Sequence, residues 1–434
     1  DGVGNETLLV KPNGITRSQS FDARRRVTER AFTQAGEAVN PGQFAFTYNS
    51  LDKLLGVSQT QADGNTRLHS YAYDSMGRLT EAQDLGGVSQ FTHDLNGNLS
   101  TESIGEESRA YTYTSGDKLT QATISDESGI LARISQEYTR AGQLAQRSFG
   151  SQTEVFSYDA KGRITEARLP RGGFFAREYD AGDRVTSQGS YVTGRPERFA
   201  YDSLDRLTSY HAIGIQESYE YDRVGNRTKK SSRQGESTYS YDEANRLTSV
   251  DGVDYTYDEV GNLLSDGARE YSYNGADQVS QLVSEDMTQF LSYDFMHRQV
   301  TQLSLPTEGE QTTTETHYRA FSFDPLQERH REYAGTEVVD SSLVRPVYTP
   351  DTRDLVGQSG SGFTAIHTDH QNTPYSVTDG ENVLWRGLHT PFGEQKSGDS
   401  FPVGHQGARQ VSGDLVNHGR RWYNTSSGSF TSPD

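Results

Sequence analysis

Three nearly adjacent side chains towards the C-terminal end are of the types that bind zinc. These are His367, Asp369 and His370, and imidazole and carboxylate groups are good zinc ligands. Positions i and i+3 of a strand face opposite sides, so the two histidines would point apart. We therefore expect these residues to be structural and expect no metal site and no cofactor.

Two other motifs have a simpler explanation than ligand binding. The segment from Asp94 to Asn98 has the oxygen-rich alternation of a calcium loop but lacks the later Glu at loop spacing. The glycine-rich segment from Gly357 to Gly362 lacks the Lys and the following helix of a phosphate loop. We expect a turn at the first segment and a flexible loop at the second. No Ser-His-Asp arrangement is indicated by spacing.

A Tyr-Asp pair, a turn and then Arg-Leu-Thr recur along the chain. Between Tyr158 and Tyr293, successive copies lie 16 to 22 residues apart, and self-similarity at such a period predicts a repeat architecture. The residues that define the repeat are Tyr73, Asp74, Gly77, Arg78, Tyr158, Asp159, Tyr201, Asp202, Tyr221, Asp222, Tyr241, Asp242, Tyr257 and Asp258.

The residue types within one copy predict a β-hairpin. A second aromatic stands two positions before most of the tyrosines, as Tyr71 does before Tyr73, which places both rings on one face of a strand. We expect each Tyr to pack its ring inward and to keep its hydroxyl in water. The Asp carboxylate starts a turn by bonding an N–H two residues on, and Gly or Asn then takes the left-handed conformation.

One hairpin of this size is too small to be stable alone, so the copies must stack. This predicts an all-β fold, in which one long antiparallel sheet runs from about residue 40 to beyond residue 320 without a break. The polar stretch from Ser304 to His317 is expected to be an extended hairpin tip or a surface loop. No long apolar pattern with the period of a helix is present.

Composition excludes several classes of function. The net charge of the 434 residues is −19, and a surface of this sign repels nucleic acid. Cysteine is absent, so no disulfide framework and no thiol chemistry are expected. No stretch approaches 18 apolar residues, which argues against a membrane span. The chain opens with Asp1 and has no leader pattern, so we expect it to be part of a longer protein.

These motifs resemble the YD-repeat (Rhs) family of bacterial polymorphic toxins, to which the C component of Tc toxins and the teneurins are more distantly related. The resemblance extends into the tail of the chain, which is similar to the Rhs-associated core. The matching core residues are Asp369, His370, Pro374, Trp385, Pro391, Phe392 and Gly393. The chain departs from the family pattern at Asn372, Arg409, Asn424, Thr425 and Ser429, which puts the chemistry of the core in doubt.

The resemblance implies a hollow shell. In such proteins the repeats spiral into a cocoon, the core plugs one end, and a variable toxin domain follows and stays enclosed until delivery. We expect residues 1–39 to continue the shell, residues 40–325 to form the YD-repeat shell, and residues 326–434 to form the core. The implied protein is bacterial and secreted or exported. Its implied partners are its own C-terminal toxin domain, a component of a delivery machine, or a second shell-forming chain.

The resemblance also implies a self-cleaving site in the core. Aspartyl cleavage needs two carboxylates that share a proton across a water molecule. Asp434 matches the acidic position of the family, and Arg421 or Arg420 would polarise the scissile carbonyl or hold a carboxylate ionised. Asp414 is the nearest upstream acidic residue but matches no family position. The alternative is that the Ser-Pro-Asp ending is a plain turn.

Three functions remain open from the sequence. The chain is a non-enzymatic shell that holds an effector, an aspartyl autoprotease, or a cell-surface adhesion or carbohydrate-binding protein whose exposed tyrosine rings stack on sugars. The order of repeats and core favours the shell, because an adhesive role does not require a plug.

Overall fold

The computed structural model describes residues 2–84, 86–168, 170, 174–189, 195–369, 371–380, 382–397, 401–419 and 421–433. Within these residues the chain is almost entirely β-strand and contains no α-helix. The prediction of an all-β fold built on a long antiparallel sheet is confirmed.

The first sheet has 24 strands, and each strand pairs antiparallel with the next one in the chain. Its strands are β1 (Leu8–Val10), β2 (Ile15–Phe21), β3 (Val27–Gln34), β4 (Glu37–Tyr48), β5 (Leu54–Thr60), β6 (Thr66–Tyr73), β7 (Leu79–Asp84), β8 (Gly87–His93), β9 (Leu99–Ile104), β10 (Glu107–Tyr113), β11 (Leu119–Asp126), β12 (Gly129–Tyr138), β13 (Leu144–Phe149), β14 (Gln152–Tyr158), β15 (Ile164–Arg168), β16 (Phe174–Tyr179), β17 (Val185–Gly189), β18 (Pro196–Tyr201), β19 (Leu207–Ala212), β20 (Ile215–Tyr221), β21 (Arg227–Ser232), β22 (Gly235–Tyr241), β23 (Leu247–Val250) and β24 (Val253–Asp254).

A second sheet of 13 strands continues the same up-and-down order. Its strands are β25 (Thr256–Tyr257), β26 (Leu263–Ser265), β27 (Arg269–Tyr273), β28 (Val279–Ser284), β29 (Met287–Tyr293), β30 (Gln299–Pro306), β31 (Gln311–Tyr318), β32 (Pro325–Ala334), β33 (Glu337–Tyr348), β34 (Leu355–Ser359), β35 (Phe363–Thr368), β36 (Pro374–Thr378) and β37 (Val383–Arg386). The remaining strands are β38 (Leu388–His389), β39 (Gln395–Ser397), β40 (Arg409–Ser412), β41 (Leu415–Asn417), β42 (Trp422–Asn424) and β43 (Ser429–Phe430), with one 3₁₀ turn, η2 (His405–Gly407).

The sheet differs from the sequence-based expectation in three places. Its hairpins begin at Leu8 and not near residue 40, because the turn at Asp22 is a copy without the Tyr. The ladder is interrupted at Tyr255, between β24 and β25, where the Tyr255 N–H donates to Thr248 O. Gly357 lies within β34 and not in a flexible loop. Its lack of a side chain leaves room for the Phe363 ring beside the strand. The stretch from Ser304 to His317 forms the extended hairpin of β30 and β31.

Each repeat turn is closed by its own aspartate. In the turn after β6, Asp74 Oδ1 accepts hydrogen bonds from the N–H groups of Met76 and Arg78, both at 2.9 Å, and the Arg78 Nε atom lies 2.7 Å from Asp74 Oδ2. Gly77 has a φ of 76°, in the left-handed region that glycine adopts at low cost. The turns at Asp159, Asp180, Asp202 and Asp242 have the same bonds.

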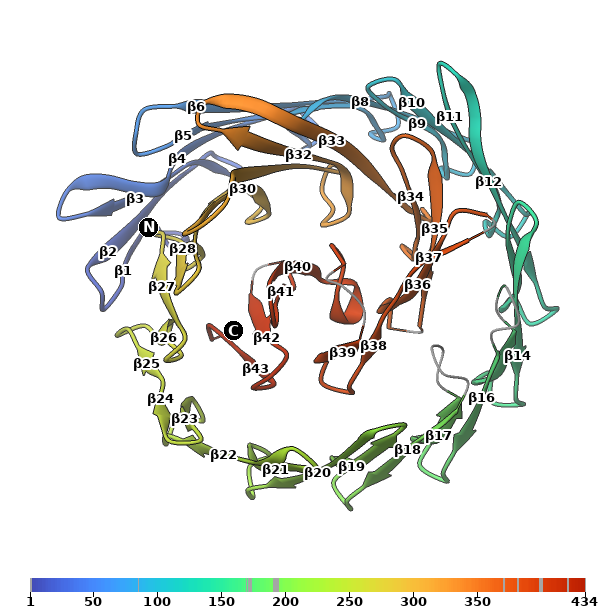
Figure 1. Ribbon diagram of the computed structural model, residues 1–434. Coiled ribbons are helices and arrows are strands. Elements are labelled where there is room, and N and C mark those ends of the chain that lie inside the picture. The colour runs from blue at the N-terminus through green and yellow to red at the C-terminus, as the bar shows by residue number, and fades with distance from the viewer. Residues whose placement is uncertain are drawn as a thin grey trace.

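A β-bulge lies immediately before the tyrosine of the repeats. The register shifts between Ala72 and Tyr73, between Ala200 and Tyr201, and at the same place in the other copies. A bulge bends its strand, increases the local twist and re-aims a side chain. Repeated once per hairpin on the same side, it curls the sheet, and Figure 1 shows the resulting roll.

The re-aimed tyrosines connect successive hairpins. Tyr201 Oη donates to Val185 O at 2.9 Å, and Tyr221 Oη donates to Leu207 O at 2.7 Å. The acceptor is always the residue five positions after the first residue of the preceding turn. The tyrosines that make this bond are Tyr48, Tyr73, Tyr113, Tyr138, Tyr158, Tyr179, Tyr201, Tyr221, Tyr241, Tyr257, Tyr273, Tyr293 and Tyr318. The expectation that these hydroxyls stay in water was wrong, because burial brings them onto a backbone acceptor.

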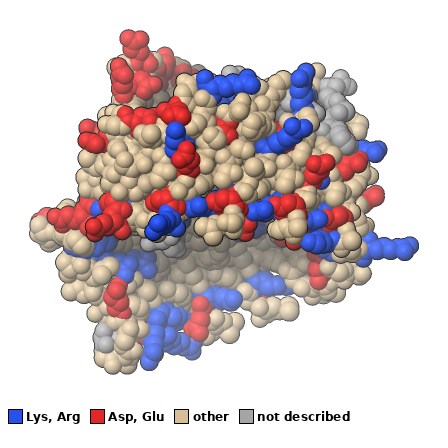
Figure 2. Space-filling model, turned by 90° about the horizontal axis from the view of Figure 1, so that it is seen from below, with Lys and Arg blue, Asp and Glu red and all other residues tan. Residues whose placement is uncertain are grey.

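In the turns that carry an arginine, its guanidinium reaches the next hairpin. The guanidinium of Arg184 stacks on the Tyr201 ring at 5.1 Å from its centroid, and Arg184 Nη1 donates to Asp202 O at 3.1 Å. Some neighbouring turns are also joined by an ion pair, as Arg184 Nη1 lies 2.7 Å from Asp205 Oδ1 of the next turn. Figure 2, which looks onto the wall formed by β17–β24, shows basic and acidic side chains alternating in a row above a recess.

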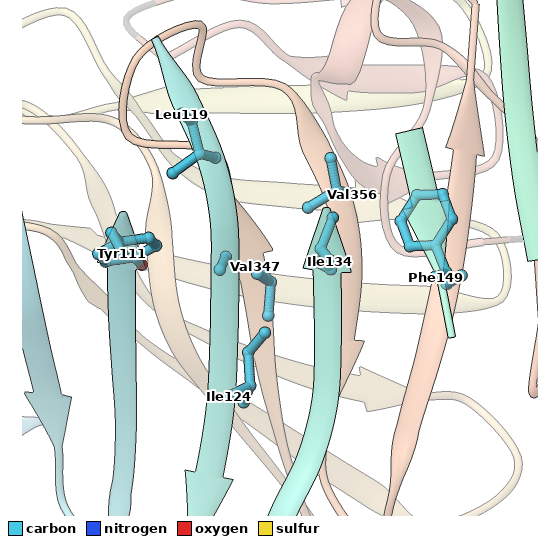
Figure 3. Packing of buried hydrophobic residues seen from close by; sticks show 9 residues of the cluster. Tyr111, Leu119, Ile124, Ile134, Phe149, Val347 and Val356 are labelled. Carbon is cyan, nitrogen blue, oxygen red and sulfur yellow. The ribbon is translucent and has the colours of Figure 1, made fainter. Parts of the chain in front are cut away.

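The roll overlaps itself, so that two layers of sheet pack face to face. Strands β28–β37 lie inside the curve of β4–β14 (Figure 1). A cluster of buried apolar side chains, shown in Figure 3, fills the interface between β10–β13 and β33–β35. Its members are Tyr111, Leu119, Ala122, Ile124, Ile134, Phe149, Val347, Val356 and Ala365. Full burial of one such Leu or Ile side chain stabilises the fold by about 1.5–3 kcal/mol.

Buried ion pairs fix how the two layers are aligned. Both Arg319 Nε and Arg319 Nη2 lie 2.9 Å from the carboxylate of Glu102, which is fully buried in β9. Further along, Arg147 Nη2 lies 2.7 Å from Asp354 Oδ2. Because an unpaired buried charge is costly, each pair favours one alignment of the inner layer on the outer one.

The tyrosine contact between hairpins is testable at Tyr201. Replacement by Phe keeps the ring beneath Arg184 and removes only the hydroxyl, so Tyr201→Phe should cost about 1 kcal/mol of stability, the net contribution of one hydrogen bond. Tyr201→Leu also removes the stacked ring and should cost more. Urea unfolding and hydrogen exchange in β17–β19 measure both effects. Equal stability of wild type and Tyr201→Phe would contradict a stabilising role for this bond.

Candidate functional site

The C-terminal strands lie inside the roll. Figure 1 shows β38–β43 and the C-terminal end of the described chain enclosed by the two large sheets. These short strands form two small sheets, β38–β39 and β40–β43. The segment from Leu388 to Pro433 is called the inner segment below. Its contacts with the surrounding wall define the candidate site.

The core motif at Asp369 has the same turn as the repeats. The Asp369 N–H donates to Thr373 O at 2.9 Å, and Asp369 Oδ1 accepts from the N–H groups of Gln371 and Thr373. Asn372 has a φ of 63°, and Pro374 begins β36. His370 lies outside the described residues. The neighbouring His367 contacts Glu154 of the outer layer at 2.7 Å and Thr378 of the adjacent strand β36 at 3.0 Å.

The motif from Thr390 to Glu394 is a further copy of this turn. The Thr390 N–H donates to Glu394 O, the Glu394 N–H donates to Thr390 Oγ1, and Gly393 has a φ of 89°. Pro391 and Phe392 occupy its centre. A Cβ added to Gly393 would lie 2.4 Å from His405 Cγ, so the close approach of η2 requires glycine here. The remaining core residue, Trp385, stacks on Phe401 at 4.9 Å.

Arg227 holds the inner segment onto the wall through an aromatic cage. Its guanidinium lies 4.6 Å from the Tyr239 ring centroid, 4.6 Å from that of Phe392 and 5.9 Å from that of Tyr219. Arg227 Nη2 also donates to the backbone carbonyls of Ser426 and Ser427. Cation–π contacts are stronger where the cation is desolvated, and Arg227 is almost fully buried.

The sequence analysis missed Arg227, although a signal was present. In several copies of the repeat an apolar residue follows the last turn residue; these residues are Leu79, Ile164, Val185, Leu207 and Leu247. After Asn226 this position is occupied by Arg227. An arginine at an inward-facing position needs an acceptor on the inner side of the wall. The carbonyls of Ser426 and Ser427 provide one.

Ion pairs supplement this anchor along the same wall. Lys230 Nζ lies 2.7 Å from Glu394 Oε2 and 3.2 Å from Glu217 Oε1. Arg269 pairs with Asp414, and Arg409 Nε lies 3.5 Å from Glu328 Oε1. Asp414 is therefore engaged by a wall arginine.

Backbone and apolar contacts continue to the end of the described chain. Thr431 O accepts from the Leu263 N–H at 2.9 Å and from Tyr273 Oη at 3.3 Å. Trp422 packs with Leu415 and Val411 against a buried patch of the wall. The wall residues of this patch are Leu263, Tyr271, Val279, Leu291 and Tyr293.

Of the three residues expected to cleave the chain, the structure places only Arg421. Its guanidinium lies 4.0 Å from the Phe430 ring centroid. Asp434 and Arg420 lie outside the described residues. The distance from Asp434 to a second carboxylate, on which the cleavage prediction depends, is therefore not established.

The charge state of the site differs from that of the repeat turns. Burial raises the pKa of Asp369, whereas hydrogen bonds from the backbone and side chain of Arg78 lower the pKa of Asp74 in the equivalent turn. The difference arises chiefly because Asp369 is buried and Asp74 is not, and the guanidinium hydrogen bond that Asp74 receives from Arg78 has no counterpart at Thr373. Burial also lowers the pKa of His389 and of His405 to about 4, so both are neutral at pH 7.

The described residues offer neither a metal-binding cluster nor a membrane-spanning helix. No group of three or more His, Cys, Asp or Glu residues within them could hold a metal ion. Within the same residues, no helix is long and apolar enough to cross a membrane.

A rolled sheet of Tyr-Asp hairpins is the architecture of a YD-repeat shell protein. The model of the Teneurin YD-shell family matches residues 3–188 and 176–434 of this chain, and the chain therefore belongs to the teneurin YD-shell family. The predicted resemblance to YD-repeat (Rhs) shells is confirmed. No curated protein sequence matches the chain.

One solved structure agrees on the fold. A chain in the crystal structure of TcdB2-TccC3-TEV superposes with a TM-score of 0.73 at 14% identity, and the match covers 100% of this chain and 27% of that one. A chain of the Photorhabdus luminescens Tc holotoxin pore, with a mutated TccC3, is 12% identical over 100% of this chain and 32% of that one, at a TM-score of 0.33. This chain thus spans about a quarter of the first similar structure.

The anchor is testable by replacing Arg227. Arg227→Leu restores the usual apolar residue of the repeat but removes the bonds to Ser426 and Ser427, so we expect hydrogen exchange in residues 422–431 to rise about tenfold or more, since hydrogen bonds to a charged group contribute about 1.5–3 kcal/mol. Arg206→Leu is the matched control, because Arg206 stacks on Tyr221 and bonds Asp202 and Asp222 within the repeats. Unchanged exchange in Arg227→Leu would show that the cage does not hold the segment.

The burial of the Asp369 carboxyl predicts how the stability of the protein depends on pH. Burial raises the pKa of Asp369 in the folded state. The stability contributed by the protonated carboxyl is therefore fully present below the unfolded pKa of about 3.9 and is lost as the pH rises through the folded pKa. Asp369→Asn keeps an oxygen acceptor without the charge, so it should melt above wild type at pH 8 and lose this advantage near pH 4. Asp74→Asn is a control in which the melting temperature should change in the opposite direction, so it should melt below wild type at pH 8. Identical melting of Asp369→Asn and wild type at pH 8 would contradict the prediction.

Proposed function

We propose that this chain is the shell of a secreted bacterial Rhs-type toxin and that it encloses a C-terminal effector domain. The observation that carries the proposal is the position of the chain end. Thr431 is bonded to the inner face of the wall at Leu263 and Tyr273, so residues that follow Pro433 start from inside the roll.

The fold and the anchors support this proposal. A shell must keep its contents from leaving, and the inner segment is held by Arg227 and Lys230 from β21 and by Arg269 from β27. The similar fold of TcdB2-TccC3, a Tc toxin component, supports the same role. Within the proposal, residues 1–39 continue the shell, residues 40–325 form it, and residues 326–434 form the core. The effector is the main partner, and a delivery component or a second shell-forming chain is a further one.

The proposed release step is hydrolysis of the peptide backbone near the end of the core. Asp434 would share a proton with a second carboxylate and activate a water molecule, which attacks the scissile carbonyl. Arg421 or Arg420 would stabilise the negative charge that develops on the carbonyl oxygen. The proton then passes to the leaving amide nitrogen.

No observation favours the adhesive alternative. Carbohydrate binding by the repeats requires exposed tyrosine rings. The repeat tyrosines described above are instead half-buried or buried, and their hydroxyls donate to backbone carbonyls.

Mass spectrometry of the gene product extended beyond Asp434 tests the cleavage step. We expect two fragments, with a cut shortly after Asp434, and a single uncut chain for Asp434→Asn. Asp340→Asn is the matched control, because Asp340 is an exposed residue of β33 and lies far from Asp434 along the chain, and it should be cut normally. An uncut chain in wild type would refute self-cleavage but leave enclosure open.

A separate measurement tests enclosure. The two fragments should co-elute under native conditions, and protease should digest the downstream fragment only after the shell is unfolded. A downstream fragment that elutes alone or is digested in the native state would refute the proposal that the chain is a container.

A further inference from the structure

A polar cavity lies between the two layers of the roll. It has a volume of about 180 Å³ and is bounded by β6 and the end of β7 on the outer layer and by β30, β31 and β32 on the inner layer. The residues used below are Arg67, His69, Asp84, Asp294, Glu315 and His317. One buried water needs about 10–15 Å³ of such space, so the cavity holds more than one or two water molecules.

Its polarity contrasts with the rest of the interface. Between β10–β13 and β33–β35 the two layers are joined by the apolar cluster of Figure 3. Around β6 the corresponding inward positions carry Arg67 and His69, which alternate on one strand and so face the same side.

Donor atoms in this cavity lack acceptors. His69 is 5% exposed, and neither of its ring nitrogens has a hydrogen-bond partner. Its ring is held edge-on to Phe295 at 5.2 Å. Arg67 Nη2 donates to Ser292 Oγ at 3.0 Å, but the buried Nη1 atom has no partner. A buried polar atom without a partner costs free energy, so these atoms indicate a missing ligand.

The carboxylates around the cavity are already paired with other groups. Asp294 Oδ2 lies 2.7 Å from Arg298 Nε, and Glu315 Oε1 lies 2.7 Å from Arg331 Nη1. Asp84 contacts His317 and accepts from the Gly86 N–H. The Arg67 guanidinium therefore has no carboxylate partner. Burial lowers the pKa of His69, which leaves a neutral imidazole with one N–H to donate.

We propose that this cavity binds a small oxyanion of the phosphate or sulfate class, which bridges the two layers of the roll. Arg67 Nη1 and one ring nitrogen of His69 donate to its oxygens. Guanidinium groups match oxyanions in charge and geometry, and the cavity has room for a tetrahedral anion with a few waters. Because only the rolled chain forms the cavity, the bound anion stabilises the overlap of the two layers.

Calorimetric titration with inorganic phosphate at constant ionic strength tests this site, with sulfate as a second probe. For the full chain we expect one phosphate per chain and a melting temperature that rises by about 2 °C or more at saturation. Arg67→Gln should weaken binding at least tenfold and abolish the rise. His69→Gln is a second variant with a smaller change in charge, and it should weaken binding in the same direction.

Arg168→Gln is the matched control. It removes the same charge from a side chain that is 73% exposed, and it should bind phosphate as wild type does. Far-UV circular dichroism verifies that each variant is folded. No stoichiometric binding to wild type would mean that the cavity holds only water, and equal binding to Arg67→Gln would mean that phosphate sits elsewhere. Either result would overturn the proposal.

Discussion

The contact between the tyrosine of one hairpin and the preceding turn is the interaction on which the structure depends. A single hairpin cannot stand alone, and backbone pairing by itself does not determine how sharply a sheet curves. The bulge before Tyr201 turns its ring towards the preceding hairpin, where its hydroxyl bonds Val185 and its ring lies under Arg184. Repeated in successive hairpins, this arrangement sets a constant angle between neighbours and thus rolls the sheet.

The same repeat explains where the contact fails and what replaces it. His93 stands at a tyrosine position after the turn at Asp74, so the hydroxyl bond is absent at that step of the described chain. The inner layer reinforces the sheet just beside this step, since Ser89 contacts His317 and Arg319 binds Glu102. Layer packing thus supports the outer sheet near its irregular hairpin and as far as β16, while the wall from β17 to β24 relies on tyrosine contacts and on the inner segment.

How much the sequence predicts follows from the range of each interaction. The hairpins, the aspartate turns and the left-handed turn residues depend on neighbours within five positions, and residue types there were sufficient. The overlap of β6 with β31 was not predictable, because every repeat carries the same motif and none encodes which distant repeat it will face. The core turns at Asp369 and Thr390 were not recognised as copies, since Thr373 and Glu394 replace the arginine. Arg227 was visible as an exception but had no assignable partner without the fold.

At three anchors the inner segment meets a cation of the wall, and at the pair of Arg409 with Glu328 the polarity is reversed. The wall supplies the cations Arg227, Lys230 and Arg269, and the inner segment supplies carbonyls and the carboxylates of Glu394 and Asp414. Because Arg227 and Lys230 lie on β21 and Arg269 lies on β27, in a wall whose angles are already set by tyrosine contacts, the segment can satisfy them all in one position only. The buried Arg227 finds its carbonyl acceptors where the inner segment lies against the wall, so this contact favours the enclosed position.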